Sequence, residues 1–399
     1  MSGSIKNLTR RLIAMRTSIK FLKQRSSIKF ICLLGSILSL QLHAQETKDG
    51  FKNSFDDRQQ MTSMPDSLAH SLRFPVTTPL QLVHDSDIQC LDPREEKDLA
   101  VPQNLKYMGM LTAMKADTLD LEKWKSDVYA ALKMGNLQVV EFLVLNNDPW
   151  LFKSFRLFRE KLSFLSQFGV GVIVIVQELL FDPSTGHIND NYKSLWKKMR
   201  LTLYPYQWMI KGFYLYDEPF WNVEVNVRKG NSSYVSEQEM YDNLSLVGKL
   251  IHKSYSRIPL IYVEAYTMIS PRLRIPEVFD WIGMDCYTGF DNCEGQSIPS
   301  YYAILKQLQP GKKMVVLPPS MIFKKPQDIT NEDRLKVKNI YKQYMSWLQT
   351  EKDIILSLSF IYRYDQTTEV FTGAQKICES ADIHRLFWRK YYQSQFDKN

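Results

Sequence analysis

Eight short apolar runs recur along residues 104–399, and most of them are followed by a longer amphipathic stretch. We interpret the runs as strands, because strands that are buried on both faces are almost continuously apolar. The predicted strands are Lys106–Met114, Leu137–Leu145, Val170–Gln177, Gly212–Tyr216, Leu260–Ala265, Trp281–Cys286, Lys313–Leu317 and Ile354–Ile361. This alternation predicts an α/β fold of the (β/α)8 type, a TIM barrel; a doubly wound open sheet is the alternative.

Helices are expected between most of these strands. The predicted helices lie at Leu121–Met134, Trp150–Phe168, Asn191–Leu203, from Ser236 onward, at Ser300–Leu308, from Thr330 to Leu348 and at Ala381–Tyr392. The connection between the fifth and sixth strands contains Pro271 and Pro276, so we expect it to be short or distorted.

The N-terminal segment has the pattern of a secretory signal. A basic stretch ends at Lys29, the apolar run Phe30–Leu40 follows, and Ala44 offers a small residue for cleavage. The apolar run is shorter than the roughly 20 residues that span a membrane. We therefore predict a signal peptide at 1–44, a polar arm or linker at 45–103 and the barrel at 104–399, in a protein secreted to the periplasm or the medium. An uncleaved membrane anchor is the alternative.

The net charge of +8 does not indicate a nucleic-acid partner. Residues 1–45 contain eight basic residues and no acidic one, so the excess lies in the predicted signal peptide. The rest of the chain is balanced, which is unfavourable for binding a phosphate backbone.

Four cysteines remain after the predicted signal peptide: Cys90, Cys286, Cys293 and Cys378. An even number in an exported chain permits two disulfides, and Cys286 and Cys293 are close enough in sequence to close one loop. The sequence leaves the pairing open, and free, partly buried thiols are the alternative.

Acidic residues gather at the predicted strand ends, where the active sites of barrels lie. Glu178 follows the third strand, Asp217 and Glu218 follow the fourth, and Glu264 and Asp285 lie near the ends of the fifth and sixth. Glycosidic cleavage needs one carboxyl group to protonate the leaving oxygen and a second to act as nucleophile or to activate water. The pattern therefore indicates carboxylate acid/base chemistry on a carbohydrate.

Aromatic residues follow the same strands. Flat rings suit the apolar face of a sugar, although a packed rim is the simpler reading for any single ring. The predicted substrate-binding residues are Trp150, Glu178, Trp221, Glu264, Tyr266, Tyr287, Tyr362 and Tyr364.

Two segments carry a family resemblance. Gly212–Pro219, ending in Asp217-Glu218-Pro219, resembles the end of the fourth strand in glycoside hydrolase barrels, and Phe279–Tyr287 looks like a sixth strand of that superfamily. The resemblance implies that Glu218 is the general acid/base. It spans residues 104–393 in topology but only these two segments in motif.

The seventh predicted strand departs from that pattern. Families with this motif usually take a nucleophilic glutamate from the end of strand seven, whereas here the strand continues into Pro318, Pro319 and Ser320. Barrels of this kind also pair carboxylates from strands four and six, so the resemblance implies Asp285 as our first choice for the second carboxylate, ahead of Glu264 and Glu178. Because strands four and six are not neighbours, we expect the longer carboxyl separation that accompanies inversion. Asp217 is either catalytic or a helper that orients Glu218, and it reaches the site only if the strand bends at Pro219.

Other barrel chemistries fit less well. Of the six histidines only His187 lies near a strand end, so we expect no metal ion. Phosphate-binding barrels need glycines in the loops after strands seven and eight. The sequence has no glycine between Gly311 and Gly373, so we expect no cofactor. The predicted function is a secreted glycoside hydrolase acting on a poly- or oligosaccharide. A catalytically inactive carbohydrate-binding barrel is the alternative, and an unrelated exported barrel is the third reading.

Mass spectrometry of the exported protein tests the signal prediction. We expect a mature chain that begins after Ala44, because signal peptidase cleaves behind small residues. An exported chain that still contains residues 15–44, whether translation starts at Met1 or at Met15, contradicts this prediction.

Overall fold

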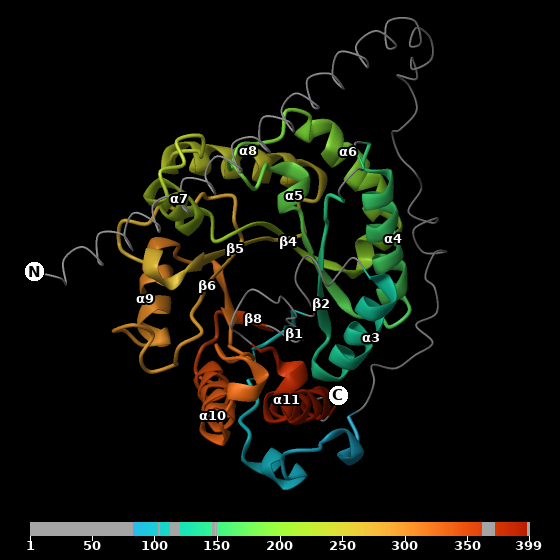
Figure 1. Cartoon of the computed structure of the whole chain (residues 1–399), viewed down its shortest axis with the longest axis vertical. Helices are drawn as coiled ribbons and strands as arrows, with labels where there is room; N and C mark the ends of the chain where they lie inside the picture. The colour runs from blue at the N-terminus through green and yellow to red at the C-terminus, as the bar shows by residue number, and fades with distance from the viewer. Residues whose placement is uncertain are drawn as a thin grey trace, which may run out of the picture. The chain divides into compact units, whose positions relative to one another are not determined.

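Eight parallel strands pair in chain order and close on themselves, because β1 is hydrogen-bonded to both β2 and β8 (Figure 1). This computed structural model describes residues 83–102, 104–111, 120–145, 148, 150–360 and 372–396, all within a unit that spans Pro75–Asn399. The predicted (β/α)8 barrel is confirmed. The predicted signal peptide lies outside the described residues, and among those that are described no helix is long and apolar enough to cross a membrane.

Five strands are shorter than predicted, the fourth is longer, and the fifth and seventh have the predicted length. They are β1 Tyr107–Met110, β2 Leu137–Glu141, β3 Gly171–Ile175, β4 Ile210–Asp217, β5 Leu260–Ala265, β6 Trp281–Asp285, β7 Lys313–Leu317 and β8 Ile354–Ser359. The predicted bounds of β5 and β7 are confirmed residue for residue.

Helices form a ring around the barrel (Figure 1). They are α3 Leu121–Ala131, α4 Phe152–Ser166, α5 Gln177–Leu180, α6 Tyr192–Leu203, α7 Pro219–Arg228, α8 Glu237–Ser254, α9 Ile298–Leu308, α10 Asn331–Leu348 and α11 Cys378–Phe396. Between β5 and β6 there is only the short 3-10 turn η6, Tyr266–Met268, as the prolines predicted. Helix α7 was not predicted, and it begins directly behind the candidate catalytic motif.

The strands separate two apolar cores. One lies inside the barrel and consists of Leu137, Val139, Ile173, Ile261, Val263, Val315, Leu317 and Leu356. The other, larger core lies between the strands and the helices and includes Val140, Leu260, Tyr262 and Ile282. Side chains therefore alternate between inside and outside along each strand, and the face on which a residue falls decides whether it reaches the barrel mouth.

The described part of the predicted arm packs against α11 (Figure 1). It forms two 3-10 turns, η1 Asp85–Asp87 and η2 Pro93–Asp98. The buried carboxylate of Asp382 accepts hydrogen bonds from the backbone amides of Gln89, Cys90 and Leu91, at 2.8, 2.6 and 3.3 Å. These contacts fix the arm to the last helix independently of any covalent link.

The four cysteines form two disulfides, Cys90–Cys378 and Cys286–Cys293. The first joins the arm to α11 across a sequence separation of 288, and the second spans a separation of 7 behind β6. The alternative of free thiols is therefore wrong for this structure.

Replacing Cys90 and Cys378 together by alanine should destabilise the protein by about 2–5 kcal/mol, because a cross-link over a long loop restricts the unfolded chain. Chemical denaturation under non-reducing conditions measures the loss. The matched control replaces Cys286 and Cys293, whose short loop predicts a smaller change. Equal losses from the two variants would contradict the loop-length argument.

Candidate active site

Strand β4 is irregular just before the Asp217-Glu218-Pro219 motif. The pairing register with β5 shifts between Tyr214 and Asp217. Tyr214 packs on the core inside the barrel, whereas Leu215 and Tyr216 both pack in the outer core. The extra outward residue returns Asp217 to the inner face, where it accepts a hydrogen bond from the Tyr214 hydroxyl at 2.5 Å. Strand β4 thus deviates before the motif rather than at Pro219.

Glu218 occupies a strained backbone position. Its φ of 43° and ψ of 58° are left-handed, a conformation that costs a non-glycine residue about 1 kcal/mol or more. It is the N-cap residue of α7, and Pro219 starts the helix. The side-chain amide of Asn222 donates to the carbonyl oxygens of Asp217 and Glu218, at 2.8 and 3.0 Å, and holds this turn. With this backbone the Glu218 side chain makes no hydrogen bond to the first amides of α7.

The carboxyl groups of Glu218 and Asp285 are hydrogen-bonded to each other. Asp285 is the last residue of β6 and is 6% exposed. Its Oδ2 also accepts from the Tyr287 hydroxyl at 2.7 Å. A hydrogen bond between two carboxyl groups requires a proton on one of them, so the pair carries one proton and one negative charge. Our expectation of a wide, water-filled separation between the two groups is wrong.

The surroundings decide which carboxyl group keeps the proton. Burial raises the pKa of Glu218, and the negative charges of Asp285 and Asp217 raise it further. Burial and Asp217 also raise the pKa of Asp285, but the hydrogen bonds from Glu218 and Tyr287 oppose that rise. Glu218 is therefore the protonated partner and Asp285 the ionised one. The pair therefore places a proton donor, Glu218, directly beside an ionised carboxylate, Asp285.

Glu264 lies on the other face of its strand. It is the fifth residue of β5, alternates with the inward Ile261 and Val263, and is 0% exposed. Its oxygens accept hydrogen bonds from the backbone amides of Phe220 and Trp221 and from the Tyr262 hydroxyl. The sequence predicts substrate binding for Glu264, but the structure leaves none of its surface accessible to a ligand.

The other predicted binding residues are spread over the rim. Glu178 lies in α5, and its side chain accepts a hydrogen bond from the Val144 amide at 3.1 Å. Trp150 lies just before α4, and its side chain is 71% exposed. Trp221 lies on the first turn of α7, and Tyr287 is half-buried and stacks on Phe360 with ring centroids 5.1 Å apart. Tyr362 and Tyr364 lie outside the described residues.

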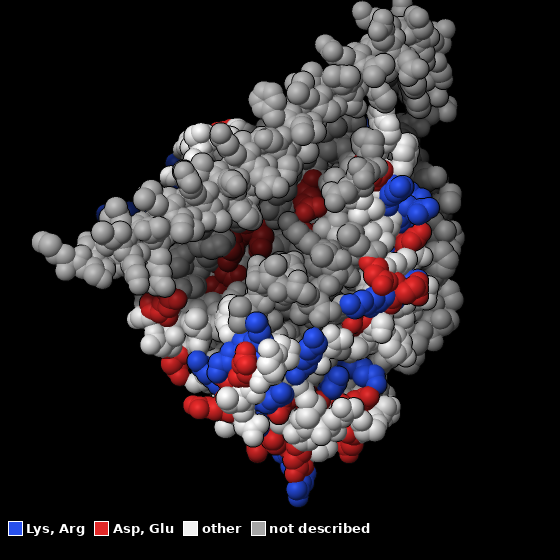
Figure 2. Space-filling model, in the orientation of Figure 1, with Lys and Arg blue, Asp and Glu red and all other residues white. Residues whose placement is uncertain are grey.

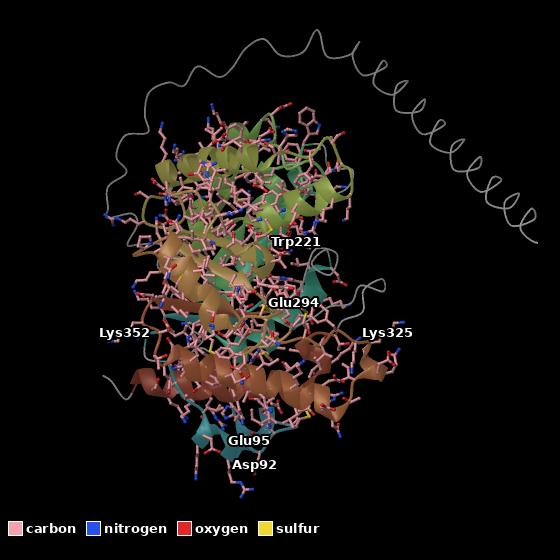
Figure 3. All side chains as sticks on the ribbon, turned by 90° about the vertical axis from the view of Figure 1, so that its left-hand side faces the viewer. Asp92, Glu95, Trp221, Glu294, Lys325 and Lys352 are labelled. Carbon is pink, nitrogen blue, oxygen red and sulfur yellow. A yellow bond between two sulfur atoms is a disulfide. The ribbon has the colours of Figure 1, made fainter. Side chains whose placement is uncertain are left out.

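Sequence reasoning missed Glu294. Its backbone is also left-handed, with φ of 46°, in the tight turn from Cys293 to Gln296 that directly follows the loop closed by the Cys286–Cys293 disulfide. Its carboxylate accepts a hydrogen bond from Tyr266, a predicted binding residue. Glu294 and Trp221 lie on the same side of the barrel as Lys325, opposite Lys352 (Figure 3). Local sequence gave little signal for Glu294, because the disulfide and Tyr266 act on it from other parts of the fold.

The barrel face in Figure 2 is hollowed, and acidic side chains are visible deep in the hollow. Among the residues described, the one cluster with ligands spaced for a metal ion is Cys90, Cys378 and Asp382. Both of its cysteines are in a disulfide, so it offers no thiolate to a metal ion.

No protein-family model matches the sequence. No curated protein matches it either.

Several solved structures are similar. They include β-glucuronidase 2 of Bacteroides uniformis, at 13% identity and a TM-score of 0.45, covering 65% of this chain and 31% of that one. A β-glucosidase of Thermotoga maritima shares 10% identity with a TM-score of 0.48, covering 72% of this chain and 99% of that one. An exo-β-1,4-mannosidase of Opitutaceae bacterium strain TAV5 shares 9% identity with a TM-score of 0.47, covering 71% and 60%. This chain spans about a third of the Bacteroides enzyme, and we draw no conclusion on activity from likenesses this distant.

Replacing Glu218 by Gln should stabilise the protein increasingly as the pH rises. The unfolded wild-type chain loses the Glu218 proton above about pH 4.3, whereas the folded chain keeps it, so wild-type stability falls with rising pH. Gln has no proton to lose. We expect the gain to grow by up to about 1.4 kcal/mol for each pH unit between pH 4 and pH 8 in which the folded protein keeps the proton and the unfolded chain has lost it.

Denaturant unfolding at several pH values measures this gain. Glu224→Gln is the matched control, because Glu224 lies on the same helix α7 in an ion pair with Arg228. A difference between E218Q and wild type that stays constant with pH would show that Glu218 ionises normally in the folded protein.

Proposed function

We propose that this chain is an exported glycoside hydrolase that cleaves a poly- or oligosaccharide with Glu218 as general acid/base and Asp285 as nucleophile. The observation that carries the proposal is the contact of the two carboxyl groups at the mouth of a (β/α)8 barrel, where burial and the neighbouring charges raise the pKa of Glu218 above that of Asp285 and so favour a proton on Glu218 and a charge on Asp285. These are the two protonation states that glycosidic cleavage needs at its start.

In the first step Glu218 transfers its proton to the glycosidic oxygen as the bond from that oxygen to the anomeric carbon breaks. The Asp285 carboxylate attacks the anomeric carbon and forms a glycosyl ester. In the second step the Glu218 carboxylate takes a proton from water, and the water oxygen attacks the anomeric carbon and releases Asp285. Two displacements return the original configuration, so the proposed outcome is retention.

The separation of the carboxyl groups supports retention over inversion. An inverting enzyme keeps its carboxyl groups about 6.5–9.5 Å apart so that a water fits between them, whereas a retaining one holds them about 5–5.5 Å apart. Groups in hydrogen-bond contact are closer together than either range, so their spacing lies nearer to that of a retaining enzyme and leaves no room for a water between them.

Neighbouring side chains support the two roles. Tyr287 donates to Asp285 and so stabilises its charge before attack. Asp217, which accepts a hydrogen bond from the Tyr214 hydroxyl, adds a negative charge that favours the protonated form of Glu218. Asp217 therefore acts through Glu218 as a helper. The half-buried rings of Trp221 and Tyr287 are candidates for the apolar face of the sugar.

Export is part of the proposal. The disulfides Cys90–Cys378 and Cys286–Cys293 suit an oxidising compartment, and the N-terminal segment has the pattern of a signal peptide.

A carbohydrate-binding protein without turnover is the second candidate. The observation that favours it is β7, which ends at Leu317 and is followed by Pro318, Pro319 and Ser320, with no carboxylate where the resembled families place their nucleophile.

Turnover of a panel of poly- and oligosaccharides separates the two candidates. On a substrate that the wild type cleaves, Glu218→Gln should lower kcat on the order of 10²–10⁴-fold, because the leaving oxygen is no longer protonated. Glu224→Gln is again the matched control and should keep the wild-type rate.

Proton NMR of the first product should show the same anomer as the substrate. An inverted product would overturn Asp285 as nucleophile, and normal turnover by E218Q would overturn Glu218 as acid. Binding without any turnover by the wild type would favour the second candidate.

A further inference from the structure

The start of helix α7 is capped in an unusual way. The first backbone amides of a helix have no partner within it, and the side chain of the N-cap residue usually accepts from the amide two or three positions on. Here the N-cap residue is Glu218, and its side chain makes no such bond. The amides of Phe220 and Trp221 therefore need another acceptor.

Glu264 is that acceptor. Its Oε2 accepts from the Phe220 amide at 3.0 Å and its Oε1 from the Trp221 amide at 3.1 Å. The carboxylate thus reaches across from β5 and caps α7 from a neighbouring element. A negative charge at this end also interacts favourably with the helix dipole.

Glu264 is itself fixed on all sides. The Tyr262 hydroxyl donates to Oε2 at 2.7 Å and the Ala265 amide to Oε1 at 3.2 Å. The side chain is fully buried. Burial raises the pKa of Glu264 to about 7, while these four donors favour the ionised form.

We propose that Glu264 is a positioning residue for Glu218. By capping α7 from β5, it frees the N-cap side chain, which then turns to Asp285 instead of folding back on the helix. The left-handed turn at Glu218 is held from two sides, by Glu264 on the amides that follow it and by Asn222 on the carbonyl oxygens. The catalytic part of this inference rests on the proposed function, and the positioning part does not.

A purely structural cap and a positioning residue predict different results. Loss of a structural cap lowers stability and leaves the chemistry of the remaining folded protein unchanged. Loss of a positioning residue moves the Glu218 carboxyl group, which changes its proton affinity and the catalytic step. The ionisable groups that face Glu218 are Asp217 and Tyr214 from β4, Glu264 from β5, and Asp285 and Tyr287 from β6 and its following loop.

The central test is Glu264→Gln, which keeps the size of the side chain but replaces one acceptor oxygen by a donor. On a cleaved glycan we expect kcat to fall on the order of 10²-fold, as for a misplaced catalytic group, with KM within about threefold. We also expect the alkaline limb of the pH–rate profile to move to lower pH, because a negative charge near Glu218 is lost. A change in KM alone, or an unmoved alkaline limb, would overturn the proposal.

A second readout needs no substrate. The infrared carbonyl band of protonated Glu218, identified by its loss in Glu218→Gln, should shift or titrate at lower pH in Glu264→Gln. If the wild type cleaves no glycan and this band still responds, the proposed function fails and the positioning role stands. If glycans are cleaved and the band and the pH profile stay as in the wild type, the positioning role fails alone.

Two further variants guard against general destabilisation. Tyr262→Phe removes one donor to Glu264 and keeps both bonds to α7, so it should fold and show a smaller effect in the same direction. Asp382→Asn alters another fully buried carboxylate, which binds three backbone amides of the arm. It should lose stability without moving the alkaline limb. An alkaline limb moved equally by Asp382→Asn would overturn the proposal.

Discussion

The alternation of side chains in a closed barrel is the constraint on which the site depends. Each strand presents successive residues to the interior and to the helices, so a residue at a strand end reaches the mouth only from the inner face. Asp285 meets this condition in a regular strand. Asp217 meets it because β4 shifts register after Tyr214, and Glu218 meets it because its backbone is left-handed. The acidic cluster of Asp217, Glu218 and Asp285 therefore arises from a regular strand, β6, and from the irregular end of β4.

The architecture was accessible from the sequence because it depends on patterns that repeat. Near-continuous apolar runs marked all eight strands, and β5 and β7 were located to the residue. The motif segment also identified the strand ends that supply Glu218 and Asp285. Such features are local or periodic, so a single sequence contains them.

The remaining features depend on partners far away in the sequence. Helix α7 was missed because its cap comes from Glu264 on β5 rather than from a serine or aspartate beside it. The outward face of Glu264 was hidden because Leu260–Ala265 is apolar on both faces, which removes the alternation that reveals orientation. The pairing of Cys90 with Cys378 depends on where the arm meets α11. The contact between Glu218 and Asp285 likewise arises from the left-handed turn, which no sequence pattern announced.

The site concentrates unfavourable terms that a stable barrel has no need for. Three carboxyl groups lie together in a partly buried mouth, and a non-glycine residue sits in a left-handed turn. The surrounding structure offsets them with fixed donors: Tyr287 for Asp285, Tyr214 for Asp217, and Asn222 on the carbonyl oxygens of the turn. A strained backbone such as the one at Glu218 persists only where the surrounding structure fixes it through several contacts. A purely structural role for this mouth explains neither the hydrogen bond between Glu218 and Asp285 nor the cap that Glu264 supplies to α7 from β5. The acid/base chemistry that we propose would use both features, and for this reason we propose the function at this turn.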